Sequence, residues 1–91
     1  MTKDEKALLE NALDSLDRLY DCVSTVTDIH ALMFATSKAL AGSRYHSFFE
    51  PFIDELHLIV RSGDSLEVRR EKALIATDEL RGLLADSLPF P

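Results

Sequence analysis

The chain has 91 residues, of which 46% are hydrophobic and 29% are charged, and its formal net charge is −6 at pH 7. This composition indicates one folded domain over residues 1–91 and excludes an intrinsically disordered chain, because the apolar side chains suffice for one core. The negative charge argues against nucleic acids and anionic membranes as partners, since both are bound mainly through Lys and Arg, and it favours a basic protein partner.

Cysteine content and the amino-terminal residues indicate a compartment. Cys22 is the only cysteine, so the chain cannot form an internal disulfide. Residues 3–6 are all charged, which is unlike the apolar segment of a signal peptide, and no run approaches the ~18 apolar residues of a membrane span. We therefore expect a cytoplasmic protein.

The first predicted helix covers residues 3–24 and opens with a capping box between Thr2 and Glu5. Apolar residues at alternating steps of three and four predict that one side of this helix faces the core. These residues are Leu9, Ala12, Leu16, Leu19, Val23 and Val26. The opposite side carries four carboxylates, which we call the acidic ridge: Glu10, Asp14, Asp17 and Asp21.

The second predicted helix covers residues 28–41. A run of β-branched and hydroxyl residues at 23–27 predicts a break before it, and Thr27 or Asp28 is the expected cap. Gly42 suits the left-handed turn that closes a helix. Consecutive apolar side chains leave almost no polar face near the start, which is typical of a central helix or of an interface. The candidate residues for a dimer interface are Leu32, Met33 and Phe34.

The third predicted helix covers residues 48–61, with a capping box between Ser47 and Glu50 that would place Pro51 in the first turn. Phe49, Phe52 and Leu56 are among the residues that form its apolar stripe. Two aromatic side chains fall off this stripe, and they either pack over the end of the bundle or contact a partner. These two are Tyr45 and Phe48.

The fourth predicted helix covers residues 65–88, with a cap at Asp64 and Glu67. Its apolar stripe consists of Leu66, Ala73, Thr77, Leu80, Leu84 and Leu88. Prolines end the helix and predict a short extended tail over residues 89–91. The predicted fold is all-α, an antiparallel bundle of four helices, or of three if the first two helices are continuous.

The three histidines do not follow the pattern of a metal site. Asp54 and His57 share a face of one helix, but a metal-binding bundle needs inward ligand pairs from several helices. Asp28 and His30 are two positions apart, which splays their side chains, and His46 lies in a predicted loop. We therefore expect no metal and no cofactor.

Catalytic motifs are also not apparent. Cys22 follows Asp21, whose negative charge disfavours a thiolate nucleophile. Bacterial phosphotransfer domains place Lys and Gly three and four residues after their histidine, and Met33 and Phe34 occupy those positions after His30. An enzyme or phosphotransfer domain that uses a histidine is therefore the weakest of three hypotheses, and we expect no enzymatic activity.

The acidic ridge supports the leading functional hypothesis. Its carboxylates form like-charge pairs at i,i+4, each costing a few tenths of a kcal/mol, which Arg18 can offset in part. The ridge is either a docking surface for a basic protein or an ordinary solvated face. The first option predicts a non-enzymatic binding protein, most concretely an immunity protein or antitoxin that neutralises a toxin such as a nuclease. The predicted partner-binding residues are Glu10, Asp14, Asp17, Asp21, Tyr45 and Phe48. The alternative is a homodimeric structural or regulatory helical protein.

Overall fold

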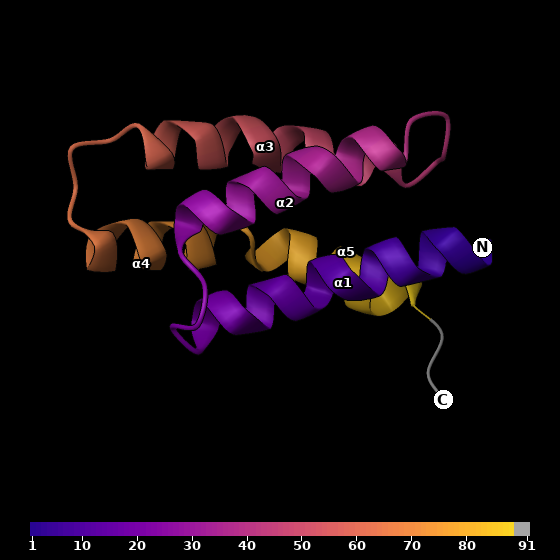
Figure 1. The fold of residues 1–91 in the computed structure, drawn as a ribbon, viewed down its shortest axis with the longest axis horizontal. Helices are drawn as coiled ribbons and strands as arrows, with labels where there is room; N and C mark the ends of the chain where they lie inside the picture. The colour runs from indigo at the N-terminus through magenta and orange to yellow at the C-terminus, as the bar shows by residue number, and fades with distance from the viewer. Residues whose placement is uncertain (89–91) are drawn as a thin grey trace.

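The computed structural model describes residues 1–88, which form five α-helices and no strand (Figure 1). The helices are α1 (Lys3–Tyr20), α2 (Val26–Ala39), α3 (His46–Val60), α4 (Leu66–Ala76) and α5 (Asp78–Ser87). The chain reverses direction after α1, α2 and α3, and α4 continues into α5, so both form the fourth arm of an antiparallel bundle. The all-α prediction is confirmed, the predicted count of four helices is wrong, and the predicted tail at 89–91 lies outside the described residues.

The helix α1 begins as predicted and ends earlier. The Thr2 Oγ1 accepts the Glu5 N–H at 3.0 Å, and the Glu5 Oε1 accepts the Thr2 N–H at 2.7 Å. The predicted end near residue 24 is wrong because Cys22 adopts a left-handed backbone with φ +63°. The N–H groups of Val23 and Ser24 then turn back to the carbonyl of Arg18 at 2.8 and 3.2 Å. The predicted break between the first two helices is present.

Thr25 caps α2, so the predicted cap at Thr27 or Asp28 is wrong. The Thr25 Oγ1 accepts the Asp28 N–H and the Asp28 Oδ2 accepts the Thr25 N–H, both at 3.2 Å. This reciprocal box needs an acid or amide three residues after the capping residue. Of Thr25, Thr27 and Asp28, only Thr25 meets this condition, because Asp28 lies three residues after it. At the other end of the helix, Gly42 has φ +86°, which confirms the predicted left-handed turn.

The helix α3 starts at His46 without a side-chain cap, so the predicted box between Ser47 and Glu50 is wrong. The Ser47 hydroxyl donates to the Arg44 carbonyl at 3.3 Å, and the Glu50 carboxylate lies 2.8 Å from the Nε2 of His46. Both predicted partners are therefore engaged elsewhere. Because the helix starts earlier than expected, Pro51 lies inside it and not in its first turn.

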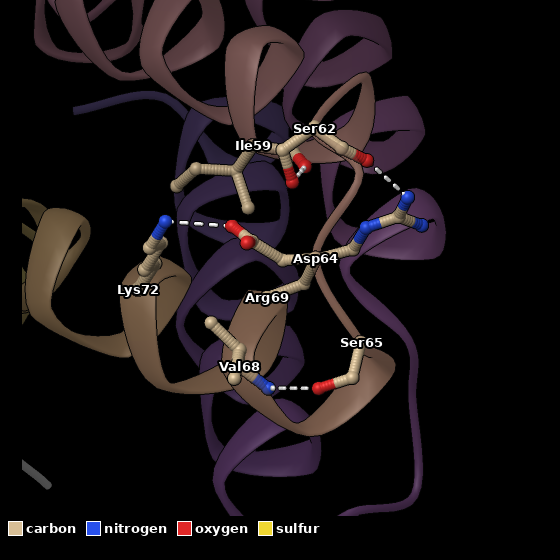
Figure 2. Close-up of polar contacts among 7 residues, drawn as sticks. All are labelled: Ile59, Ser62, Asp64, Ser65, Val68, Arg69 and Lys72. Atoms are coloured by element: carbon tan, nitrogen blue, oxygen red, sulfur yellow. Dashed lines mark hydrogen bonds and ion pairs between the residues drawn. The ribbon is translucent and has the colours of Figure 1, made fainter.

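Polar contacts in the connection from α3 set the start of α4 (Figure 2). The Ser65 Oγ accepts the Val68 N–H at 3.3 Å, so Ser65 is the cap and the predicted cap by Asp64 with Glu67 is wrong. Asp64 instead accepts a hydrogen bond from the Lys72 Nζ at 2.6 Å. This bond is the main reason why the pKa of Asp64 lies below its ordinary value.

Thr77 divides the predicted helix 65–88 into α4 and α5. Its Oγ1 donates to the Ala73 carbonyl at 2.7 Å, and the same carbonyl accepts the Thr77 N–H at 2.9 Å. A hydroxyl that bonds back to the preceding turn bends a helix. The apolar stripe alone did not reveal this break, because Thr77 is as buried as the stripe requires.

The core lies between the four arms of the bundle. Its largest fully buried side chains come from α1, α2, α3 and α5 and from Leu40, which directly follows α2. They include Leu9, Leu16, Leu19, Ile29, Met33, Leu40, Phe49, Leu56, Leu80 and Leu84. Two residues of the predicted stripes are instead 72% exposed, Val23 in the turn after α1 and Leu66 at the start of α4. The five helices of residues 1–88 are each too short or too polar to traverse a membrane.

Candidate protein-binding surface

The acidic ridge lies on the side of α1 that faces away from the core. Glu10, Asp14 and Asp21 are exposed and Asp17 is partly exposed. The Lys6 Nζ lies 3.7 Å from a Glu10 carboxylate oxygen, and Arg81 of α5 pairs with Asp17. Within residues 1–88, Asp14 and Asp21 form no ion pair. The ridge therefore keeps uncompensated negative charge at Asp14 and Asp21, on either side of Asp17.

Arg18 does not form the ion pairs that its spacing suggested. In the described part of the chain no salt bridge joins its guanidinium to Asp14 or to Asp21. Its contribution to the local structure comes from the backbone: the Arg18 carbonyl accepts the two N–H groups that close the turn after α1. The expected local offset of the ridge charge is therefore not supplied by direct contact.

A groove of about 620 Å³ runs between α1 and the bend from α4 to α5. Its lining consists of Leu16, Tyr20, Leu74, Ile75, Thr77, Asp78 and Arg81. Tyr20 is 65% exposed and Ile75 is 79% exposed, whereas Leu16 is buried. The groove thus has an apolar floor and two large apolar side chains on opposite walls.

The ridge reaches this groove at Asp17, which pairs with the groove residue Arg81. Asp17 directly follows Leu16, and one helical step turns the side chain by about 100°, here from the buried side toward solvent. Asp21 directly follows Tyr20, the last residue of α1, and both side chains are exposed. The opposite wall adds a further carboxylate, Asp78, at the start of α5. Apolar and acidic side chains therefore alternate across this part of the surface.

The helix α4 has thin apolar packing, with Ala73 buried and Leu74 partly buried against the core, and polar bonds add to it. Figure 2 shows Arg69 donating to the carbonyl of Ser62 and Lys72 reaching Asp64. On the other side, the Arg70 Nη1 donates to the carbonyl of Tyr20 at 3.2 Å and so ties α4 to the end of α1. The two walls of the groove are thus fixed without covering their apolar side chains.

The predicted aromatic site is largely internal. Tyr45 is 3% exposed, its ring lies 4.8 Å from the Arg44 guanidinium, and its hydroxyl accepts a hydrogen bond from Arg44 at 2.6 Å. The half-buried Phe48 meets the same ring edge-on at 5.6 Å. These contacts match the end-packing alternative, because Tyr45 has almost no surface left for a partner.

The three candidate dimer residues point in different directions. Met33 is fully buried and belongs to the core, Leu32 is half-buried, and Phe34 is 49% exposed. The Lys38 ammonium lies 5.3 Å from the centre of the Phe34 ring. Only Phe34 presents a substantial apolar surface, because three consecutive residues cannot share one side of a helix.

The histidines lie along the junction of α2 and α3. The rings of His30 and His57 are 5.4 Å apart, a pairing that the sequence analysis missed. The antiparallel turn at Gly42 brings the start of α2 beside the end of α3. The pairing of the two histidines could have been inferred from this arrangement. The His46 Nδ1 lies 2.8 Å from the carbonyl oxygen of Ser37. In residues 1–88, no three His, Cys, Asp or Glu side chains are grouped as metal ligands.

The groove was the main feature that sequence reasoning missed. Tyr20 and Ile75 lie off the predicted apolar stripes, so they were not assigned to any surface. Their size and their position beside acidic residues were the available signal. Comparisons of the chain with protein-family models, curated proteins and solved structures found no match.

Proposed function

We propose that this chain is a small acidic protein-binding domain that recognises a basic protein through its α1 surface. The most concrete form is a toxin-neutralising immunity protein or antitoxin that occupies a basic toxin such as a nuclease. The observation that carries the proposal is the exposed acidic ridge, in which Asp14 and Asp21 form no ion pair within residues 1–88. Asp17 of the ridge pairs with Arg81, which lines the apolar groove, so the surface offers both charge and contact area.

The proposed mechanism is occupation of a surface without covalent chemistry. Negative charge on one face attracts a cationic protein and raises the rate of productive encounter, most strongly at low ionic strength. A nuclease contacts nucleic-acid phosphates through Lys and Arg, and a bound acidic ridge would compete for those same side chains. Neutralisation then follows from covering the basic surface.

Affinity capture from an extract of the source cells tests the proposal. We expect the wild-type chain to retain a protein of high isoelectric point, identified by mass spectrometry, and the triple variant Asp14→Asn, Asp17→Asn, Asp21→Asn to lose it. The matched control is Glu67→Gln, Glu71→Gln, Asp86→Asn, which removes three exposed carboxylates elsewhere. Equal retention by the two triple variants, or retention of acidic partners only, would contradict a role for the ridge.

Self-association is a second candidate function, and one observation favours it. Phe34 is exposed and lines a groove of about 310 Å³ between α2 and α3, together with Ile53 and Asp54. A second copy could cover this side chain. Light scattering over a concentration series tests the idea: a dimer that Phe34→Glu dissociates would support it, and a concentration-independent monomer would remove it.

A further inference from the structure

The helix α4 presents more apolar surface to solvent than the packing of the bundle requires. Its one buried residue is Ala73, whereas Ile75 is exposed and lines two neighbouring grooves. The larger groove continues to Tyr20 on α1, and the smaller one, of about 390 Å³, continues to Leu58 on α3. Side chains from three helices therefore form one apolar band across the outer side of α4.

The larger groove has the dimensions and lining of a side-chain receptor. Its volume of about 620 Å³ lies within the range of roughly 300 to 1,000 Å³ found for pockets that enclose small ligands. Leu16 and Leu74 form an apolar floor, and Tyr20 and Ile75 stand on opposite walls. Large apolar side chains around a concave centre are typical of the positions that contribute most to binding free energy.

Charge selects the kind of occupant. Asp78 lies on one wall, and Asp17 and Asp21 follow the two α1 residues of the other. Arg81 also lines the groove, and its charge is paired with Asp17. An apolar occupant flanked by Lys or Arg would therefore fit, whereas one flanked by Asp or Glu would be repelled.

We infer that this groove binds an amphipathic basic helix of the partner, with its apolar residues between Tyr20 and Ile75 and its cationic residues against the acidic ridge. This inference rests on the proposed function and specifies the partner's docking element. Asp14 and Asp21 are two turns of α1 apart, which corresponds to about 10 Å along the helix axis. A partner helix parallel or antiparallel to α1 meets both with basic residues seven positions apart, and its apolar residues fall at spacings of three and four.

A second copy of this chain is a poor occupant of the same groove. A two-fold dimer brings identical surface patches together, so each acidic ridge would face the ridge of the other copy. The net charge of −6 on each chain adds to this repulsion. Charge complementarity therefore favours a basic helix.

A synthetic peptide tests the inference without knowledge of the natural partner. The probe is a helix-forming peptide of about 18 residues, long enough for five turns, with leucine at spacings of three and four and lysine at the other positions. A peptide of the same composition in scrambled order has the same charge but no apolar face. Binding is measured by fluorescence anisotropy, and contacts are mapped from amide chemical shifts of the labelled chain.

We expect the amphipathic peptide to bind more tightly than the scrambled one and to shift the amides of Tyr20, Ile75 and Asp78. Ile75→Glu should weaken its binding by about tenfold or more, as expected for a central contact residue. The control Leu66→Glu places the same charge on the same helix outside this groove and should change affinity less than about twofold. Ile75 and Leu66 are both strongly exposed, so circular dichroism should show that both variants keep the fold.

Different results separate this inference from the function on which it rests. Equal binding of both peptides, with Ile75→Glu behaving like Leu66→Glu, would overturn the groove and leave attraction by the ridge intact. Failure of both peptides to bind at low ionic strength would contradict the ridge as well. A dimer of the chain that Ile75→Glu dissociates would assign the groove to a second copy and overturn the inference.

Discussion

The guanidinium of Arg81 on α5 donates a hydrogen bond to the carboxylate of Asp17 on α1, between residues 64 positions apart in the chain. This pair joins the acidic ridge to the opposite wall of the groove. Both side chains remain nearly half exposed, so the pair contributes little to stability, about 0 to 1 kcal/mol for such surface contacts. Its larger effect is on charge, because Arg81 neutralises one carboxylate of the ridge.

Replacing Arg81 should therefore make the surface a better acceptor of cations. For Arg81→Gln we expect faster association with the captured basic partner at low ionic strength, and a loss of at most about 1 kcal/mol of stability. Asp17→Asn should change the association rate in the opposite direction. Stopped-flow fluorescence measures both variants, and slower association of Arg81→Gln would show that Arg81 itself contacts the partner.

Leu16→Ala tests the placement of α1 on the core. Leu16 is 2% exposed, and truncation of a buried leucine typically costs about 2 to 5 kcal/mol. Leu58→Ala, at an exposed position of α3, is the control and should stay within about 0.5 kcal/mol. Urea unfolding measures both. A loss below about half a kcal/mol for Leu16→Ala would mean that α1 packs by another face.

Thr25→Ala tests where α2 begins. This change removes the hydroxyl that accepts the Asp28 N–H, and loss of such a cap costs about 0.5 to 2 kcal/mol. Thr27 is the second residue of α2 and is exposed, so Thr27→Ala should leave stability almost unchanged. Thermal unfolding of both variants decides between them, and the reverse order would place the cap at Thr27.

Glu5 should contribute to the decrease of the free energy of unfolding as the pH falls into the acid range. The hydrogen bond from the Ser43 hydroxyl at 2.5 Å is the largest cause that holds the pKa of Glu5 below its ordinary value, followed by bonds from Thr2. A carboxyl with a lowered pKa stabilises the fold above its ordinary range, and this contribution disappears as the pH falls through the lowered pKa.

The variant Ser43→Ala isolates this contribution. We expect the Glu5 carboxyl to titrate at a higher pH in the variant, as followed by nuclear magnetic resonance. The pH-dependent part of the stability difference from wild type should be largest near neutral pH and shrink in acid. Ser43 also accepts the Tyr45 N–H, so a pH-independent loss is expected beside it. An unchanged titration of Glu5 would contradict the assigned contact.

The helical fold was predictable because its signals are local. The Thr2–Glu5 box, the left-handed position of Gly42 and the spacing of Leu9, Leu16 and Leu19 each depend on residues within about three helical turns. Cap choice was less predictable, because several hydroxyl and acidic residues compete near every helix start. Ser65 and Asp64 are one such case, decided by the ion pair that Asp64 forms with Lys72.

The candidate surface was only half predictable. The acidic ridge follows from helical periodicity, but its partner Arg81 comes from a distant helix and could not be inferred without the tertiary fold. The groove depends on the bend at Thr77 and on the thin packing of α4, neither of which the apolar pattern encodes. Tyr45 and Met33 were assigned to surfaces because hydrophobicity alone does not distinguish a core residue from an interface residue.

The salt dependence of association tests the central claim, that the acidic ridge docks a basic protein. The variant Asp14→Asn, Asp17→Asn, Asp21→Asn removes three negative charges with little change in side-chain size, and its stability should stay within about 1 kcal/mol of wild type.

Stopped-flow association with the captured basic partner, over a series of salt concentrations, is the most direct measurement. The ridge predicts that the triple variant associates severalfold more slowly than wild type at low ionic strength, and that the difference narrows as salt screens the field. Equal association rates of the two proteins at low salt would contradict the claim and leave the ridge as a solvated face.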